Sequence, residues 1–215
     1  MAKKKIAIVG AGAVGGYAGA HMVQAGEDVT YIDPWPENVE AIRKDGLRIT
    51  HIRDVEPFTV KPRALHLTEA QQLSKEAPID IACICMKSYD TAWATAMIKH
   101  YLAPGGYCVS LQNCMNEETI ARAGEGDAAA IKEIDEHRLA EANRPGGGEH
   151  RPSTGQDMFK GRRTEIQFLN GFVARKGDEA GIPTPTNKIL TEIVTRVEKG
   201  ELKPDPKHII DLRLN

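Results

Sequence analysis

A glycine-rich segment near the N-terminus has the residue types and spacing that bind a dinucleotide. Residues 6–9 form a short apolar run that leads directly into Gly10-x-Gly12-x-x-Gly15. Gly10 permits a tight turn after a strand, Gly12 lets a pyrophosphate approach the backbone, and Gly15 allows a helix to pack closely on the strand. The diphosphate would lie on the free N–H groups at the N-terminus of that helix, where the helix dipole favours negative charge. We therefore predict a cofactor loop made of Gly10, Ala11, Gly12, Ala13, Val14 and Gly15, and a plain glycine-rich turn is the competing interpretation.

An acidic residue at the end of the next strand indicates which dinucleotide this loop prefers. The strand predicted over 28–32 ends at Asp33, 18 residues after Gly15. An acid in this place hydrogen-bonds the ribose hydroxyls of NAD, whereas an NADP site has an arginine nearby. Repulsion between Asp33 and one phosphate charge at about 4 Å would cost roughly 1 to 4 kcal/mol, which favours NAD over NADP by roughly tenfold to a thousandfold. The competing interpretation is that Asp33 caps a helix beginning near Glu37. Trp35 is expected either to cover the adenine face or to pack on the loop.

The elements that must position these residues alternate between strand and helix. The run from Ile79 to Met86 is almost continuously apolar, as in a buried parallel strand. The alternation predicts an α/β fold, with an N-terminal Rossmann-type doubly wound parallel sheet covered on both faces. We expect helices over 18–25, 37–44, 69–74 and 89–102, and further strands over 47–50, 64–67 and 107–111.

The second part of the chain reads as helical. Residues 127–143 form a charged, alanine-rich helical stretch, and residues 144–152 form a glycine-rich linker. Two amphipathic helices are predicted over 162–179 and 186–198. Their apolar faces favour a partner, so we predict a homodimer. The predicted organisation is a dinucleotide-binding domain at 1–122, a helical connector and linker at 123–152, and a smaller all-helical C-terminal substrate and dimerisation domain at 153–215.

Composition excludes several other classes of function. The chain has 28 Lys and Arg against 30 Asp and Glu, with a net charge of −2, and no basic stripe that would bind nucleic acid. No apolar run approaches a membrane span and no signal peptide precedes the first strand, which favours a cytoplasmic location without membrane contact. The cysteine spacing indicates neither zinc nor disulfides, and no metal site is expected. Cys83, Cys85, Cys108 and Cys114 are interpreted as buried small hydrophobes, with Cys114 beside the predicted site as a minor candidate for a reactive thiol.

Four segments of the chain carry a family resemblance. They are Lys5-Ile-Ala-Ile-Val-Gly-Ala-Gly-Ala-Val-Gly-Gly-Tyr17, Met86-Lys-Ser-Tyr-Asp-Thr91, Ser110-Leu-Gln-Asn113, and the motifs between His150 and Asn187. Together they resemble the ketopantoate reductase (2-dehydropantoate 2-reductase) family. This resemblance implies NADH- or NADPH-dependent reduction of ketopantoate to pantoate, a step toward pantothenate and coenzyme A, with the 2-oxo acid as a small-molecule substrate.

The resemblance also implies roles for four residues. Lys87 would contact the cofactor, and Asn113 would lie near both the nicotinamide and the substrate. Ser153 would bind substrate, whereas Glu165 would contact the cofactor and support the catalytic site. The competing interpretations are a strand-end cation for Lys87, a turn or cap residue for Asn113, a helix-capping box at Ser153 and an acid at a helix N-terminus for Glu165.

The chain departs from the family in its middle. The family's pattern Lys-Leu-x-x-Asn-x-x-x-Asn, whose lysine is the proton donor, has no match in residues 117–152. The resemblance therefore implies that this sequence lacks an internal segment, and the chain is about one third shorter than a two-domain member, roughly one small domain. The remaining lysines match no catalytic motif, so we assign no proton donor. Loss of a general acid typically costs a factor of about 10² to 10⁴ in rate.

Three hypotheses follow from these features. The first is an NAD-preferring ketopantoate reductase, or a reductase of a related branched 2-oxo acid. The second is a dinucleotide-binding homologue without catalysis, acting as a sensor or an oligomer partner. The third is a molecule that contains the internal segment and is heavier than the 23.5 kDa of this sequence.

Overall fold

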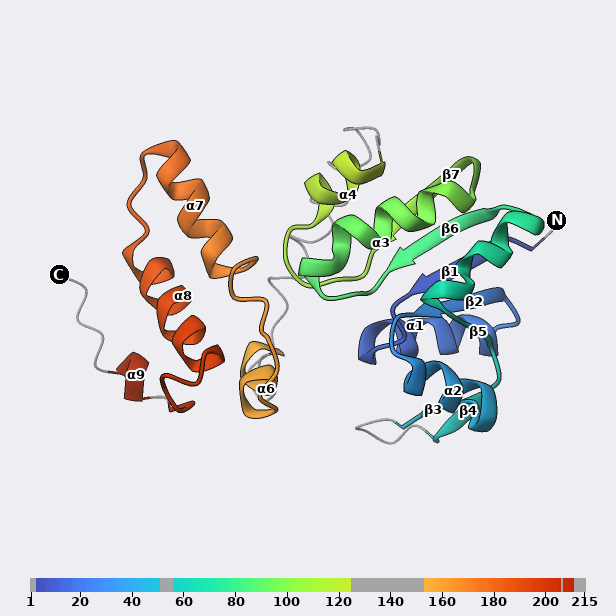
Figure 1. Ribbon diagram of the computed structural model, residues 1–215, viewed down its shortest axis with the longest axis horizontal. Coiled ribbons are helices and arrows are strands. Elements are labelled where there is room, and N and C mark those ends of the chain that lie inside the picture. The colour runs from blue at the N-terminus through green and yellow to red at the C-terminus, as the bar shows by residue number, and fades with distance from the viewer. Residues whose placement is uncertain (1–2, 51–55, 125–152, 206, 211–215) are drawn as a thin grey trace. The chain divides into compact units, whose positions relative to one another are not determined.

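The computed structural model describes residues 3–50, 56–124, 153–205 and 207–210 (Figure 1). The chain forms two compact units, Met1–Ile131 and Lys132–Asn215, and each is described by itself. The helix predicted over 127–143 and the linker predicted over 144–152 lie outside the described residues. The domain boundaries at 122 and 153 therefore stay predictions.

The first unit is built on a five-stranded parallel sheet with the strand order β5-β2-β1-β6-β7 (Figure 1). From β1 the chain runs outward through β2 to β5, then crosses back to β6 and β7, so the direction of winding switches between β1 and β6. This is the predicted Rossmann-type doubly wound topology, in which ligands bind at the carboxyl ends of the strands beside the switch point. The strands are β1 (Lys5–Val9), β2 (Asp28–Asp33), β5 (Arg63–His66), β6 (Ile79–Ile84) and β7 (Leu102–Ser110).

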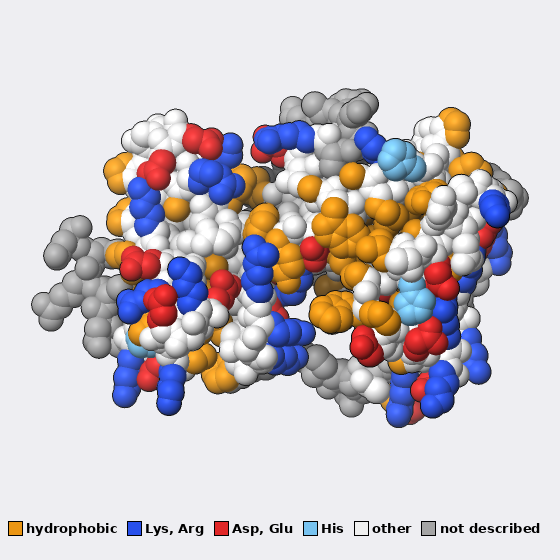
Figure 2. All heavy atoms as spheres, viewed as in Figure 1, with side chains coloured by type: hydrophobic (Ala, Val, Ile, Leu, Met, Phe, Trp, Pro, Cys, Tyr) orange, Lys and Arg blue, Asp and Glu red, His pale blue; other side chains and the backbone are white. Residues whose placement is uncertain are grey.

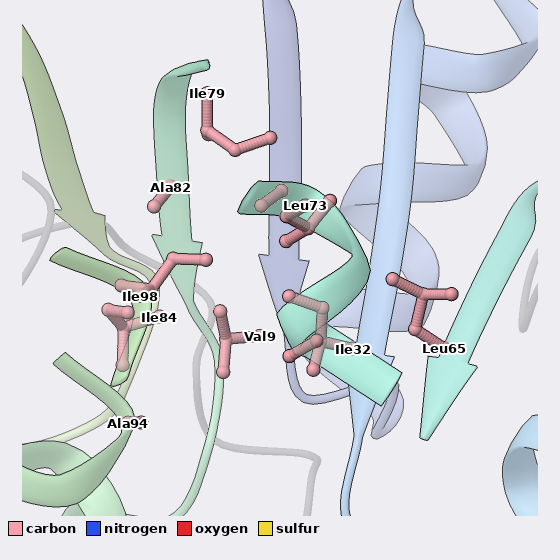
Figure 3. Close-up of a cluster of buried hydrophobic side chains, with 11 residues drawn as sticks. Val9, Ile32, Leu65, Leu73, Ile79, Ala82, Ile84, Ala94 and Ile98 are labelled. Carbon is pink, nitrogen blue, oxygen red and sulfur yellow. The ribbon is translucent and has the colours of Figure 1, made fainter. Parts of the chain in front are cut away.

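Helices cover both faces of this sheet because consecutive strand residues point to opposite sides. In β1, Ile8 belongs to a core cluster with Val39 of α2, whereas Val9 belongs to the opposite cluster with Leu73 and Ile98 (Figure 3). The predicted burial of the sheet on both faces is confirmed. The covering helices are α1 (Ala13–Gln24) and α2 (Pro36–Asp45) on one face, and the 3₁₀ helix η1 (Leu67–Lys75) and α3 (Thr91–Ile98) on the other.

Helix α1 begins at Ala13, so the prediction that it begins at Ala18 is wrong. Gly12 is the N-cap residue, and the Gly16 N–H donates to the Gly12 carbonyl at 2.7 Å. The glycine-rich pattern predicts a loop from Gly10 to Gly15, and glycine has a low helix propensity. Close packing of α1 on β1 overrides that propensity, because there is no room for side chains at Gly15 and Gly19.

The segment before β7 also differs from the prediction. The helix expected over 89–102 is split into η2 (Ser88–Asp90), α3 and η3 (Lys99–Tyr101), and β7 begins at Leu102 instead of Tyr107. Ile79 pairs with Leu102 while Ile81 pairs with Tyr107, so residues 103–106 bulge from the ladder. Strand β7 is at the edge of the sheet, where a bulge containing proline and glycine is tolerated.

The remaining elements of this unit agree with the predicted segments, with one addition. Strand β3 (Leu47–Ile49) was expected, and it pairs antiparallel with the unpredicted β4 (Phe58–Val60) in a separate two-stranded sheet. Helix α4 (Glu117–Gly124) follows β7 and packs against α3. No helix within the described ranges is long and apolar enough to cross a membrane.

The second unit is helical among its described residues, with α6 (Ser153–Phe159), α7 (Asn170–Ala180), α8 (Pro185–Glu198) and α9 (Lys207–Ile210). The prediction of α8 is confirmed, but the helix predicted over 162–179 begins only at Asn170. Thr164 is held by Glu198 at the end of α8, whose Oε1 accepts from the Thr164 N–H at 2.7 Å and from its hydroxyl. This tertiary contact accompanies a non-helical backbone where the local pattern favours helix.

Candidate functional site

The predicted cofactor loop leaves β1 and enters α1 at the carboxyl edge of the sheet. Gly10 has φ +104°, which side chains rarely adopt, and its N–H donates to the Ile32 carbonyl at 2.9 Å. A Cβ there would also lie 2.7 Å from Met86 Sδ. Helix α1 has no acidic residue in its first turn and no side-chain hydrogen bond at its N-cap. Its first N–H groups have no partners within the helix, so this terminus is suited to an anion.

The glycines of the loop have different surroundings, which separates a structural from a binding requirement. A Cβ on Gly15 would overlap the Gly10 carbonyl oxygen and lie 2.8 Å from Cys85 Cβ. For Gly12, no atom within the described part of the chain, its two neighbours in sequence aside, lies within 4 Å of the corresponding position. Folding therefore explains Gly15 but not Gly12, where the open space lets a phosphate group approach the backbone.

Asp33 lies at the end of β2 beside this loop and is only 3% exposed. Its Oδ2 accepts from the Ala11 N–H at 2.6 Å, and its Oδ1 accepts from the Trp35 N–H at 2.9 Å. The competing interpretation, that Asp33 caps the next helix, is wrong because the N-cap residue of α2 is Trp35. Each carboxylate oxygen has a second lone pair, so Asp33 can hold the loop and still accept from a ribose hydroxyl.

Trp35 projects from the loop that follows Asp33. Its side chain is 69% exposed, so the interpretation that Trp35 packs on the loop is wrong. An indole at the rim of a nucleotide site offers a face on which an aromatic base can stack.

Lys87 and Asn113 follow neighbouring parallel strands, β6 and β7, at the same edge of the sheet as the cofactor loop. Lys87 is half-buried and precedes η2, whereas Asn113 is exposed. The backbone joins this region to β1, because the Cys85 N–H donates to the Val9 carbonyl at 2.8 Å. The fold thus gathers Gly12, Asp33, Lys87 and Asn113 along the carboxyl ends of four adjacent strands.

Buried polar residues between these two loops were missed by the sequence analysis. Ser88 is 3% exposed and Asn116 is 1% exposed, and the Asn116 Nδ2 donates to the Ser88 Oγ at 3.1 Å. Gln112, 7% exposed, donates from its Nε2 to the Met86 carbonyl at 2.8 Å. The only sequence signal was the presence of polar side chains in segments that follow buried strands.

Ser153 and Glu165 belong to the second unit, and their placement toward the cofactor loop stays a prediction. Ser153 is the first residue of α6 and not the residue before it, so the capping-box interpretation is not confirmed. Glu165 is 4% exposed and lies in a turn before α7, with its carbonyl accepting from the Phe168 N–H at 2.9 Å. The interpretation of Glu165 as an acid in the first turn of a helix is wrong, because α7 begins at Asn170.

The cysteines agree only in part with the prediction of buried, unreactive thiols. None of the four forms a disulfide, and only Cys83 is fully buried. Burial raises the pKa of Cys83 and Cys108 to about 11 and that of Cys85 to about 12, so these three stay protonated near neutral pH. Within the described ranges, no cluster of His, Cys, Asp and Glu could hold a metal ion. On the face shown in Figure 2, basic and acidic side chains are interspersed.

Comparison with known proteins decides the family. Residues 6–139 match the family model "Ketopantoate reductase PanE/ApbA", and residues 95–198 match the model of its C-terminal part. The chain belongs to the ketopantoate reductase family. Two curated relatives are 2-dehydropantoate 2-reductases. The protein of Archaeoglobus fulgidus is 28% identical over 84% of this chain and 56% of its own length, and that of Pyrococcus abyssi is 36% identical over 56% and 37%. The chain thus spans about half the length, or less, of these ketopantoate reductases.

Solved structures support the same fold. A PanE/ApbA family ketopantoate reductase from Ralstonia eutropha JMP134 aligns with a TM-score of 0.70 at 23% identity, covering 92% of this chain and 99% of that one. A D-mandelate dehydrogenase solved with NADH and anilino(oxo)acetate aligns with a TM-score of 0.73 at 20% identity, covering 91% and 98%. These likenesses confirm the Rossmann-like fold followed by a helical region.

Proposed function

We propose that the chain binds NADH and reduces ketopantoate to pantoate. The observation that carries the cofactor part is the space at Gly12. It opens beside the uncapped N-terminus of α1, and no described part of the chain fills it. A diphosphate in that space would receive hydrogen bonds from the first N–H groups of α1 and a favourable interaction with the helix dipole.

The arrangement around Asp33 supports a preference for NADH over NADPH. Asp33 is a buried carboxylate adjoining the loop, and a second phosphate on the ribose would approach its negative charge. At an effective dielectric constant between those of water and a protein surface, the repulsion is about 1 to 4 kcal/mol at about 4 Å. Trp35 would stack on the adenine, since its indole is largely exposed beside the same loop.

Lys87 and Asn113 would act at the reacting end of the cofactor. When bound, the cofactor supplies a hydride to the ketone carbon of the substrate. Lys87 offers a cation to the cofactor, and the Asn113 amide offers both a donor and an acceptor to the nicotinamide and the substrate. From the second unit, Ser153 would bind substrate, and Glu165 would contact the cofactor and support the catalytic site.

We also propose the broader setting that accompanies this activity. Residues 1–122 form the dinucleotide-binding domain, residues 123–152 connect it to the helical part, and residues 153–215 form the substrate and dimerisation domain of a homodimer. The pathway is pantothenate and coenzyme A biosynthesis in the cytoplasm, without nucleic acid or membrane partners. Exposed apolar side chains in the second unit support dimerisation, Ile182 being 61% exposed.

A second candidate is a dinucleotide-binding homologue that does not catalyse reduction, acting as a sensor or oligomer partner. It is favoured by one observation. The family's lysine-bearing pattern has no match in residues 117–152, and no other lysine replaces it in sequence. A reductase of another branched 2-oxo acid is the third candidate.

One experiment separates these candidates. The purified chain is titrated with NADH and with NADPH, and oxidation of each is then followed with ketopantoate and with other branched 2-oxo acids. The proposal predicts tighter binding of NADH by roughly tenfold or more, because the 2′-phosphate of NADPH is repelled by Asp33, and the highest kcat/KM with ketopantoate. NADH binding without any turnover would favour the second candidate, and failure to bind either cofactor would reject all three.

A further inference from the structure

A group of buried side chains ties the loop that carries Lys87 to the loop that carries Asn113. The Asn116 Nδ2 donates to the Asn113 carbonyl at 2.7 Å and to the Ser88 Oγ at 3.1 Å. The Ser88 hydroxyl in turn donates to the same Asn113 carbonyl at 3.1 Å. Both N–H bonds of the amide and both lone pairs of the carbonyl are used. We call this set of three residues, Ser88, Asn113 and Asn116, the loop clamp.

A second tie lies on the other side of the two predicted site residues. The Gln112 Nε2 donates to the Met86 carbonyl and to the Thr91 Oγ1, both at 2.8 Å. Met86 and Ser88 flank Lys87 in sequence, and Gln112 stands directly before Asn113. The position of Lys87 relative to Asn113 is therefore fixed by hydrogen bonds on both sides of each residue.

The clamp also holds a strained backbone. Cys114 has φ 74°, the only positive φ of a non-glycine residue within the described ranges. Such a conformation persists only where the surroundings enforce it, and it is commonest at functional sites. The Asn113 carbonyl, which accepts two hydrogen bonds, belongs to the peptide group that joins Asn113 to Cys114. The clamp thus fixes the plane of this peptide group. The strained residue and the turn that presents the Asn113 side chain both begin at that plane.

We propose that Asn116 is a positioning residue for the reaction, acting through the Asn113 carbonyl and the Ser88 hydroxyl. At 1% exposure it reaches neither cofactor nor substrate, so its effect passes through the two loops. The proposal rests on the proposed function for the roles of Lys87 and Asn113. It gives a reason for the buried polar network. If the two loops only needed to pack together, an apolar contact could replace this network.

The test is the near-isosteric variant Asn116→Asp, which keeps the shape of the side chain but replaces the two amide N–H donors with at most one carboxyl O–H, so the clamp cannot be completed. Its matched control is Val39→Ala, which opens a cavity on α2, a helix that packs on the opposite face of the sheet from α3. Displacement of reacting groups by about 1 Å can cost about a hundredfold in rate. We expect kcat/KM for ketopantoate to fall by about that factor in Asn116→Asp and by less than about twofold in Val39→Ala, at a temperature where both are folded.

A rescue variant distinguishes positioning from general destabilisation. Cys114→Gly relieves the strain that the clamp maintains, so adding it to Asn116→Asp should recover kcat/KM by at least tenfold. Independent effects of the two changes would show no such coupling. Equal losses in Asn116→Asp and Val39→Ala, or the absence of rescue, would overturn the proposal.

Two measurements keep the test independent of turnover. If the unchanged chain does not reduce ketopantoate, the proposed function fails, and the clamp is judged by amide hydrogen exchange over residues 112–116 and by the NADH dissociation constant. The proposal expects Asn116→Asp to exchange at least tenfold faster there and to bind NADH at least tenfold more weakly. Exchange and affinity equal to those of Val39→Ala would reject the clamp itself.

Discussion

Substitution of Gly12 by alanine should separate cofactor binding from folding. A Cβ at Gly12 would meet no atom of the described residues within 4 Å apart from its two neighbours in sequence, and the backbone there has φ −68° and ψ −168°, which alanine adopts freely. Alanine is a slightly poorer N-cap residue than glycine, but it lowers the conformational entropy of the unfolded chain. These opposing terms leave the free energy of unfolding within about 0.5 kcal/mol of its original value.

The same methyl group should have a large effect on the cofactor. It would occupy the space that we assign to the diphosphate, and forcing an extra methyl group into a packed contact costs about 1 to 3 kcal/mol. The dissociation constant for NADH should therefore rise by roughly tenfold to a hundredfold. Gly15→Ala provides the contrast, because its Cβ would overlap the Gly10 carbonyl oxygen and lie 2.8 Å from Cys85 Cβ. That variant should lose about 3 kcal/mol or more of stability.

The assay combines thermal unfolding with titration of NADH, followed by quenching of tryptophan fluorescence. Gly12→Ala should melt at the same temperature as the unchanged chain but bind NADH poorly, whereas Gly15→Ala should melt at a lower temperature. Undiminished NADH binding by a folded Gly12→Ala protein would refute the reasoning, since the open space would then not hold the diphosphate.

Three further predictions concern Asp33, Glu76 and Trp35. The Asp33 carboxylate accepts from two backbone N–H groups, and in Asp33→Asn one of these would face an amide NH₂. Thermal melts should therefore show a loss of about 1 to 3 kcal/mol in the free energy of unfolding. The control is Asp28→Asn, at the exposed start of the same strand, whose stability should be unchanged. Asp33→Asn should also reduce the ratio between the dissociation constants of NADPH and NADH in paired titrations. An unaltered ratio would contradict the role of the Asp33 charge. The Arg63 guanidinium and then the Lys5 ammonium lower the pKa of Glu76 from 4.5 to about 2, so these ion pairs stabilise the fold above pH 5 and their contribution is lost as the pH falls from about 5 to 2. Melting curves of Glu76→Gln should accordingly depend less on pH in that window. Trp35→Leu should weaken NADH binding by roughly fivefold to a hundredfold, since stacking on a base is worth about 1 to 3 kcal/mol. Trp35→Phe should keep most of the affinity for NADH.

The local pattern of the sequence was sufficient to predict a parallel sheet buried on both faces and the glycine-rich turn that follows β1. In β1, Ile8 and Val9 are both apolar yet face opposite core clusters, as expected for a strand buried on both faces. The position of Asp33 at the end of β2 follows from the spacing of the βαβ unit. Its hydrogen bonds to the loop could not be predicted, because they depend on the distance between two segments that are adjacent only in the fold.

Where the prediction failed, contacts between distant residues outweighed local preference. The helix expected from residue 162 is delayed because Thr164 is bonded to Glu198, far along the chain. Strand β7 starts early because Leu102 pairs with Ile79, although proline and two glycines follow. Asn116 gave no signal of its own, since its role depends on Ser88, which the sequence separates from it by an entire helix and strand.

The measurement that tests the central claim most directly is the formation of pantoate from ketopantoate and NADH by the purified chain of verified mass. We predict that pantoate appears in equal amount to the NADH consumed, that NADPH is used less well, and that Gly12→Ala reduces the rate. Loss of a general acid can lower the rate by roughly 10⁴-fold, so the enzyme concentration must be high enough to detect so slow a reaction. Binding of NADH with no pantoate formed under those conditions would contradict the central claim.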